Sequence, residues 1–444
     1  MDVLSGIGVI AALCVMAVLI FKQVSPMLAG PAAVVIVCLT SRLPLMDALT
    51  HTYLQGVANY FVSFFPVFLL GNLLGSIYEM SGAATKIGQI IARLFGAGKI
   101  RNCMIACLLC AAVMSYGGIN SFVIIFAVYP IALRLFEEAD IPTHLLPGIV
   151  CGGMWTFAMT GPFTPQIPNI LSMENLGTTS YAGLLPGVLA SLVMAVLIVA
   201  YMTHAAKKCK REGMHFVNPA AKSGAEIEEM QGITETEKRL PSGIAGFLPI
   251  LVIIGGFNLT DWGIVIWLFI GVVLALVMQF PYLEKDRLLK KANQAAMDAL
   301  LINMNTAAIV GFGSVTGLTA FYGDLIEYLS ESHANPYVTA VLASNICACI
   351  LGSSSGGMAL MYTSLKDTFL AAAANGYQIG FIHRLCALGG GCLDTMPWNG
   401  SIVSVYSICR TTHKESYKYN FMTCGVIPLI CTVCIALPLC IILT

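Results

Sequence analysis

The sequence predicts an all-α integral membrane protein built from two inverted-topology repeats, each with about five crossings, one re-entrant helical hairpin and a broken helix. Three observations lead to this fold class. First, 57% of the 444 residues are hydrophobic and only 10% are charged, against about 25% charged residues in soluble domains. Second, the apolar residues gather in runs long enough to cross a bilayer. Third, glycine-rich and polar interruptions occur at matching places in both halves.

The composition also argues against several other classes of protein. Lys+Arg and Asp+Glu balance at 23 each, and no basic block is large enough to bind nucleic acid. The first apolar run, 3–21, lacks a basic leader and a small-residue cleavage site, so we expect a retained span rather than a signal peptide. The 16 cysteines lack the spacing of a metal site or a disulfide framework. With no nucleophile–base pair in the spans either, we expect no metal, no cofactor and no enzymatic activity.

Hydropathy divides the chain into two halves joined by a polar linker, 206–242. In the first half, 1–205, spans are expected near 3–21, 24–41, 59–80, 144–172 and 180–205, with a hairpin over 101–137. In the second half, 243–444, spans are expected near 243–260, 262–282, 296–320, 379–409 and 417–443, with a hairpin over 335–374. Gly-Gly pairs recur in the same order, at 117–118 and 152–153 and again at 356–357 and 390–391. This ordered similarity favours a duplicated unit.

The distribution of basic residues predicts the orientation in the membrane. If the linker is cytoplasmic and both hairpins are re-entrant, every lysine and arginine except Arg42, Lys366 and Arg384 falls on the cytoplasmic side. This agrees with the positive-inside rule. Both termini are then expected outside the cytoplasm, with the first hairpin opening inward and the second outward. The polar segments 82–98 and 322–333 are expected to be amphipathic connectors at the membrane interface.

Four interruptions fall within apolar runs, at 115–121, 160–169, 352–357 and 393–400. In hydrocarbon every backbone N–H and C=O must be satisfied internally, so a break must be buried in protein or line a wet cavity. A packing kink is the alternative interpretation of any single Gly-Gly pair. Broken helices offer N–H groups to an anion and carbonyls to a cation. Because no arginine lies within any break, we expect a small monovalent organic anion rather than a phosphate or a multiply charged acid.

A few polar residues inside the apolar segments have more than one interpretation. Asp394 is the one carboxylate within a break, and it would carry a coupling proton, help to bind a cation, or cap the following half-helix. Arg384, next to His383, is interpreted as an interfacial anchor. The side chains of Asn303, Asn305 and Thr306 are expected to form hydrogen bonds between helices.

Several motifs together resemble the gluconate permease family, and within it the 3-hydroxybutyrate permease-like branch. They are Gly-Gly-Ile-Asn-Ser-Phe-Val at 117–123, Phe-Ala-Val-Tyr-Pro at 126–130, Thr-Pro-Gln-Ile-Pro-Asn at 164–169, Gly-Thr-Thr-Ser-Tyr at 177–181, Gly-Ser-Ser-Ser-Gly-Gly at 352–357, Pro-Trp-Asn-Gly at 397–400 and Thr-His-Lys-Glu-Ser-Tyr at 412–417. The resemblance implies proton-coupled uptake of a small hydroxylated monocarboxylate across a prokaryotic inner membrane. It also implies the ion-transporter superfamily architecture, an elevator with scaffold and moving transport domains, in a homodimer.

Two departures from the family pattern bear on substrate and coupling. Trp398 stands where the family has a histidine, and one residue is missing between Thr160 and Thr164. Since tryptophan does not titrate, coupling cannot use that position, and a larger ring favours a short hydroxy or keto acid over a sugar acid. A sodium-coupled carboxylate symporter is the first alternative, because neutral hydroxyls and carbonyls also suit sodium. An anion channel is a second alternative.

The predicted site combines the two hairpin tips with the two broken helices. Ser115, Asn120 and Ser121 are expected to face Ser353, Ser354 and Ser355, with Asp394 carrying the coupling ion, H⁺ or alternatively Na⁺. The full set of expected substrate-binding residues is Ser115, Gly117, Gly118, Asn120, Ser121, Thr164, Gln166, Asn169, Ser353, Ser354, Ser355, Gly356, Thr395, Trp398 and Asn399. The expected partners are a small organic anion, the lipid bilayer and a second copy of the chain.

Overall fold

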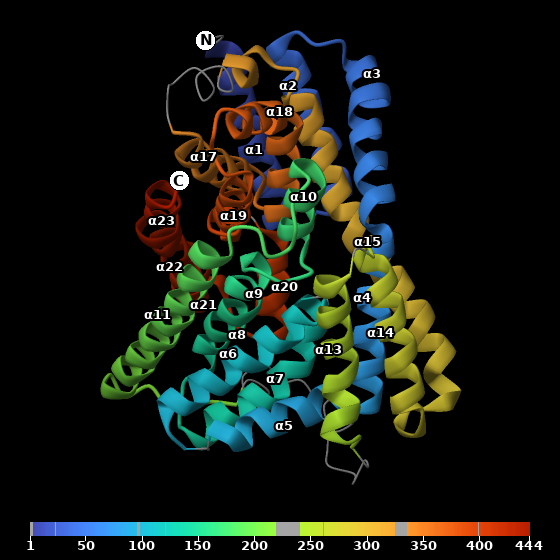
Figure 1. Ribbon diagram of the computed structural model, residues 1–444, viewed down its shortest axis with the longest axis vertical. Coiled ribbons are helices and arrows are strands. Elements are labelled where there is room, and N and C mark those ends of the chain that lie inside the picture. The colour runs from blue at the N-terminus through green and yellow to red at the C-terminus, as the bar shows by residue number, and fades with distance from the viewer. Residues whose placement is uncertain are drawn as a thin grey trace.

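The computed structural model describes residues 3–22, 24–95, 98–119, 121–218, 240–260, 262–324, 335–397 and 399–444. Every regular element of this part of the chain is a helix, which confirms the predicted all-α class (Figure 1). Five of these helical stretches are long and apolar enough to cross a membrane: Leu45–Ser81, Leu184–Arg211, Ile264–Tyr282, Asp286–Thr316 and His413–Ile442. Shorter apolar helices accompany them.

One group of helices runs from α1, α2 and α3 at the top of Figure 1 down to α13 and α14 in the lower right half of the view. It contains α1 (Val3–Phe21), α2 (Pro26–Ser41), α3 (Leu45–Asp47), η1 (Ala48–Tyr53), α4 (Leu54–Ser81), α13 (Gly243–Leu259), α14 (Ile264–Gln279), η4 (Phe280–Tyr282) and α15 (Lys285–Thr316). The longest two, α4 and α15, pack antiparallel: Lys291 Nζ lies 3.2 Å from Glu79 Oε1 at one end, and Gly56 packs against Ser314 at the other.

The second group holds the two hairpins and the two broken helices. From the first half it contains α5 (Ala83–Phe95), α6 (Ile100–Tyr116), α7 (Ser121–Glu138), η2 (Thr143–Leu145), α8 (Leu146–Met154), α9 (Phe157–Thr160), α10 (Ile167–Leu176) and α11 (Leu184–Arg211). From the second it contains α17 (Pro336–Leu351), α18 (Ser354–Ala374), α19 (Ile379–Gly390), η5 (Leu393–Thr395), α20 (Gly400–Ile408), α21 (His413–Phe421), η6 (Met422–Val426), α22 (Ile427–Cys431), η7 (Thr432–Ala436) and α23 (Leu437–Ile442).

The two hairpins open at opposite ends of α11. At the first mouth, the Asp140 carboxylate accepts hydrogen bonds from His215 Nδ1 at 2.8 Å and from Phe216 N at 3.1 Å, and Lys210 Nζ lies 3.1 Å away. These groups hold the pKa of the Asp140 carboxyl well below its usual range. The other end of α11 begins beside Gly380, just after the second mouth. Because α11 has 28 residues, the mouths are about 40 Å apart along its axis.

Several helix boundaries differ from those expected. Helix α15 begins at Lys285 rather than near 296, because its first turns are rich in charged residues and a hydropathy average excludes them. Helix α11 continues to Arg211, so the first residues of the expected linker are helical. The segment 82–98 contains α5, which buries Ile87 and Ile91 and exposes Arg93, as an amphipathic connector should. Of the other expected connector, 322–333, only 322–324 lie within the described residues.

The last span is one continuous helical stretch with two wide turns. The π-helical segments η6 and η7 each come just before a helix with proline in its first turn, at Pro428 and Pro438. Proline lacks the N–H of a helical hydrogen bond and its ring clashes with the preceding turn. A local π turn accommodates this without breaking the span.

Close packing of broken helix on hairpin requires glycine at Gly153. A methyl group at this position of α8 would overlap the backbone carbonyl of Leu108 in α6 and would lie 2.9 Å from the Cβ of Ala111. We expect Gly153→Ala to destabilise the protein by about 1–3 kcal/mol, the range for an overpacked core. Gly255→Ala in α13 is the matched control, since nothing lies within 4 Å of the added methyl. Equal melting temperatures of the two variants in detergent would contradict this account.

Candidate functional site

The tip of the first hairpin is tied to the broken helix of the same half. Helix α6 ends at Tyr116, and Gly118, with φ +75°, reverses the chain in a conformation that glycine adopts without strain. The buried Ser115 donates from Oγ to Met154 O at 3.1 Å. Gln166, from the loop before α10, donates from Nε2 to Ser115 O at 2.7 Å. The structure thus brings together three of the expected site residues, Ser115, Gly118 and Gln166.

The start of α7 is held by a residue that sequence reasoning missed. Trp155 Nε1, in the loop between α8 and α9, donates to Ser121 Oγ at 2.9 Å. A tryptophan in an apolar span looks like an ordinary core residue, so no sequence signal identifies it. Gly117 packs on α13, where an added methyl would lie 3.0 Å from Ile250. Asn120, also expected here, lies outside the described residues.

The tip of the second hairpin begins a helix with its own cap. Gly352 has φ +55°, and Ser353 Oγ accepts from Gly356 N at 3.3 Å, so that Ser353 is the N-cap of α18. Ser353 Oγ also lies 3.3 Å from Ser355 Oγ. A methyl group on Gly356 would lie 3.6 Å from the side chain of Ile309 on α15. The second tip therefore packs on α15, and none of its hydroxyls is bonded to the first tip within the described chain.

Asp394 lies directly beside the second tip. Its carboxylate is near the backbone N–H groups of Ser354 and Thr395, and only 7% of the residue is exposed. Yet Oδ1 has no hydrogen-bond partner among the residues that the structure describes. The capping alternative accounts for part of this environment, since nearby N–H groups face the carboxylate. It does not account for the unpaired oxygen, which remains able to hold a proton or a cation.

The same type of hydrogen bond occurs in each of the two broken helices. Asn399 Nδ2 donates to Asp394 O at 2.8 Å, and Asn169 Nδ2 donates to Thr164 O at the same distance. In both cases the acceptor lies five residues before the asparagine. Asp394 therefore occupies in the second half the place that Thr164 occupies in the first. This correspondence supports a duplicated unit, while the inverted repeat itself stays a prediction.

In three of the expected pocket residues, the polar side-chain atoms form hydrogen bonds that hold the breaks together. Thr164 and Asn169 are 0% exposed, and Thr164 Oγ1 donates to Ala158 O at 2.7 Å. Asn399 Oδ1 accepts from Ser401 N at 2.7 Å while its amide nitrogen holds Asp394 O. These contacts give the three side chains a structural role. Their contact with a substrate stays a prediction, as does that of Trp398, which lies outside the described residues.

The interpretation of Arg384 as an interfacial anchor is wrong. Its side chain is 0% exposed and crosses from α19 into the first half of the chain. The guanidinium donates from Nε to Ala182 O at 3.0 Å, from Nη1 to Thr160 O at 2.6 Å and from Nη2 to Ser180 O at 2.9 Å. A broken helix leaves such carbonyls without helical partners, and a guanidinium has five N–H groups to satisfy them. No carboxylate of the described chain pairs with Arg384.

His383 acts beside Arg384 in the same bridge between the halves. Its Nε2 lies 2.7 Å from Asn169 Oδ1 and its Nδ1 lies 2.6 Å from Thr178 Oγ1. No arginine lies within a break in the sequence, but in the fold Arg384 bonds to the carbonyl of Thr160, which belongs to a break. In space, an arginine and a histidine from the second half close the broken helix of the first.

The two tips meet the antiparallel pair of α4 and α15 at different heights. The carbonyl of Gly118 at the first tip would lie 3.1 Å from a methyl on Gly71 of α4, whereas the second tip packs against Ile309 of α15. The pairing of α4 with α15 places Gly71 opposite Ala299, and the ten residues from Ala299 to Ile309 span about 15 Å along the helix axis. The two tips therefore contact the helix pair at positions about 15 Å apart along its axis.

The apolar span of α15 has two asparagines with different environments. Asn305 accepts from Ser25 Oγ of α2 at 3.0 Å, which confirms the expected bond between helices. Thr306 donates to Ile302 O within its own helix at 3.2 Å. Asn303 is 0% exposed, and neither its Oδ1 nor its Nδ2 has a hydrogen-bond partner within the described chain. The expectation of an interhelical bond is therefore wrong for Asn303 and for Thr306.

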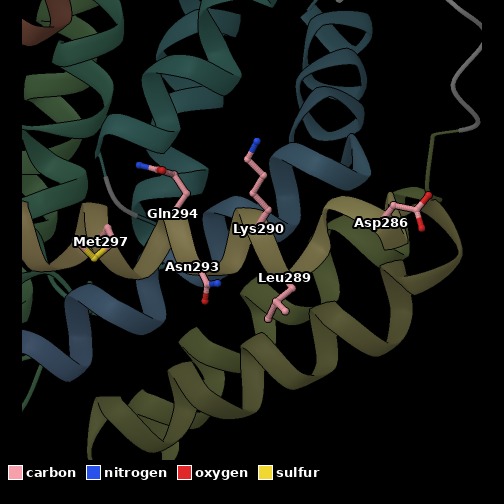
Figure 2. A pocket seen from close by; sticks show the side chains of 6 residues that line it. All are labelled: Asp286, Leu289, Lys290, Asn293, Gln294 and Met297. Carbon is pink, nitrogen blue, oxygen red and sulfur yellow. The ribbon is translucent and has the colours of Figure 1, made fainter.

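A surface groove of about 520 Å³ lies on the first turns of α15, lined by Asp286, Leu289, Lys290, Asn293, Gln294 and Met297. Figure 2 shows that Lys290 and Gln294 point away from Leu289 and Asn293, so one helix supplies opposite sides of the feature. The groove holds none of the expected site residues. We assign it no part in the site.

Comparison with known proteins identifies similar chains. The model of the GntP family permease matches residues 4–255. A protein of Bacillus subtilis described as the uncharacterized transporter YxjC is 28% identical over 439 residues, which cover 90% of this chain and 92% of the relative. The crystal structure of the YdaH transporter of Alcanivorax borkumensis superposes with a TM-score of 0.50 at 16% identity, over 87% of each chain. The last similarity concerns the fold alone.

Proposed function

Because this chain belongs to the GntP family of permeases and is a multi-pass membrane transporter by that membership, we propose that it is a secondary active transporter of a small hydroxylated monocarboxylate. Transport proceeds by alternating access of the elevator type. The observation that carries the proposal is Asp394, a buried carboxylate with one unpaired oxygen beside the N-terminus of α18. A group able to bind a cation thus lies next to a helix end able to bind an anion.

We take the coupling ion to be a proton and keep sodium as the alternative. An unpaired carboxylate is costly in a buried position, and binding either ion removes that cost. The hydroxyls of Ser353 and Ser355 next to backbone carbonyls would also suit sodium. Asp394 is expected to bind the coupling ion in both cases. The two ions are therefore distinguished by which imposed gradient, of protons or of sodium, drives accumulation.

Uptake of radiolabelled 3-hydroxybutyrate into proteoliposomes tests this function. We expect accumulation when a pH gradient is imposed, and none when a sodium gradient is imposed at fixed pH. Accumulation driven by sodium alone would favour the sodium symporter, and uptake that does not saturate would favour a channel. Unlabelled gluconate should compete more weakly than unlabelled 3-hydroxybutyrate, because Trp398 narrows the pocket in this proposal. Equal competition would contradict the preference for a short acid.

The orientation is tested by fusions to alkaline phosphatase, which is active only outside the cytoplasm. We place the linker in the cytoplasm of a prokaryotic cell and both termini on the outer side, on the basis of the lysine and arginine distribution. Phosphatase fused after Thr444 should therefore be active, and phosphatase inserted between 219 and 239 inactive. Green fluorescent protein at the same two positions is the reciprocal control. The reverse pattern would invert the topology.

Two copies are expected to associate in the membrane, as the resemblance to the superfamily implies. The mass of the detergent-solubilised protein, measured by light scattering after subtraction of bound detergent, tests this. A mass near twice the 47.3 kDa of one chain is the expected result. A single-chain mass in mild detergent would contradict it.

A further inference from the structure

Asn258 lies near the end of α13, at the border between the two groups of helices (Figure 1). On one side α13 packs on α14 of its own group, where a methyl on Gly271 would overlap Ile253. On the other side it packs on α5, in the group that holds the hairpins, where a methyl on Gly246 would lie 3.1 Å from Ile87. Asn258 is therefore a polar residue on a helix that contacts both groups.

The amide of Asn258 bonds across this border with both of its polar atoms. Nδ2 donates to Phe163 O, in the broken helix of the first half, at 3.1 Å, and to Ile254 O of its own helix at 2.7 Å. Oδ1 accepts a hydrogen bond from Ser180 Oγ, just before α11. A primary amide has two N–H donors and an acceptor oxygen, so all three are used. Two of the three bonds join one group of helices to the other.

The backbone that Asn258 holds is strained. Phe163 has φ +68°, in the left-handed region that a bulky side chain rarely adopts. Its N–H donates to Ser180 O at 3.1 Å, so bonds from Ser180 and from Asn258 hold both sides of the residue. Strain of this kind persists only where the surroundings fix it, and it is typical of segments that switch conformation. Loss of the Asn258 bond would therefore allow Phe163 to relax.

Apolar contacts accompany these bonds at the tip of the first hairpin. A methyl on Gly117 would lie 3.0 Å from Ile250 of α13, and one on Gly118 would lie 3.1 Å from Leu268 of α14. Apolar contacts are not directional, so two such surfaces can slide past one another. Hydrogen bonds instead require particular distances and angles. The bonds of Asn258 therefore fix the relative position of the two groups in this conformation.

We propose that Asn258 is a latch between the two groups of helices. Its bonds to Phe163 and Ser180 hold the group with the hairpins in the conformation described here, and they break when that group moves past α13. This inference rests on the proposed function, because the elevator mechanism requires such a movement. It adds to that function a specific contact that must open in every transport cycle.

The test bridges the latch with zinc in proteoliposomes. Ser180→His and Asn258→His together place two imidazoles across the contact, and imidazole is a common zinc ligand. We expect Zn²⁺ to reduce uptake of 3-hydroxybutyrate by this double variant at least tenfold, and EDTA to restore it. The control is Ser25→His with Asn305→His, a pair that lies within one group of helices and should keep its uptake within about twofold. A rise in melting temperature with Zn²⁺ shows that a bridge has formed.

Asn258→Leu provides a second measurement, because a histidine in place of the buried Ser180 can prevent folding. The change removes the bonds to Phe163 and Ser180 without adding a bridge. We expect hydrogen–deuterium exchange over 160–166 to become at least fivefold faster in detergent, since the strained backbone is no longer held. Gly255→Ala in the same helix is the control and should leave this exchange unchanged, because the added methyl meets nothing within 4 Å.

Two outcomes would overturn the inference. If Zn²⁺ raises the melting temperature of the Ser180→His, Asn258→His variant while its uptake continues at the zinc-free rate, the contact stays closed during transport. If Asn258→Leu exchanges over 160–166 as the wild type does, the amide does not hold the broken helix. If the wild type transports no monocarboxylate, the proposed function fails, and the exchange measurement still decides whether Asn258 holds this segment.

Discussion

Replacing Asp394 by asparagine is expected to abolish gradient-driven accumulation of 3-hydroxybutyrate, with at least a tenfold loss. Asparagine keeps the size and the hydrogen-bonding capacity of the side chain but cannot bind a proton and binds a cation weakly. Because Oδ1 has no partner in the described chain, its replacement breaks no internal hydrogen bond. The melting temperature in detergent should therefore stay close to the wild-type value. Uptake into proteoliposomes under a pH gradient, and then under a sodium gradient, measures the effect.

The matched control is Asp367→Asn, an exposed carboxylate on α18 in the same half. It should accumulate substrate as the wild type does. Full accumulation by Asp394→Asn under a pH gradient would remove Asp394 as the proton carrier and favour the capping alternative. Loss of accumulation under a sodium gradient only would assign Asp394 to sodium binding.

Replacing Arg384 by alanine is expected to have the largest effect on stability. The change leaves the carbonyls of Thr160, Ser180 and Ala182 without donors at a fully buried position and opens a cavity the size of a long side chain. Each unpaired buried group costs about 1–3 kcal/mol. We therefore expect a loss of at least about 3 kcal/mol, seen as a large drop in melting temperature or as failure to recover folded protein from the membrane.

Arg93→Ala removes an exposed arginine from α5 and is the control, with an expected change below about 0.5 kcal/mol. Arg384→Lys keeps the charge but not the planar fork of donors, so it should be intermediate. A melting temperature for Arg384→Ala equal to that of Arg93→Ala would contradict the bridging role. An intermediate value for the lysine variant would support donor geometry over charge.

The hairpins, the broken helices and Asp394 could be located from the sequence because the cause is local. Backbone groups in hydrocarbon must find partners within a few residues, so glycine, serine and proline in an apolar run mark a break wherever they occur. The same locality explains the errors at helix ends. Charged turns such as those at the start of α15 extend a helix beyond the apolar window that detects it.

The bonds of Arg384 and the unpaired amide of Asn303 could not be predicted in this way. The three carbonyls that Arg384 bonds lie 224, 204 and 202 residues away in the sequence, in the other half of the chain. Asn303 and Asn305 look equivalent along the sequence, but in the fold Asn305 bonds to the Ser25 hydroxyl whereas the Asn303 amide has no hydrogen-bond partner in the described chain.

The sequence by itself thus determined that this protein is a helical membrane transporter with two hairpins and a carboxylate at a break. Composition, the length of apolar runs and the need to pair backbone N–H and C=O groups depend on residues close together in the chain, so they can be read from the sequence. Only the tertiary structure decided which polar side chains close the breaks and which remain unpaired. Those outcomes depend on the packing of helices from opposite halves of the chain, which determines the partner that each donor and acceptor meets.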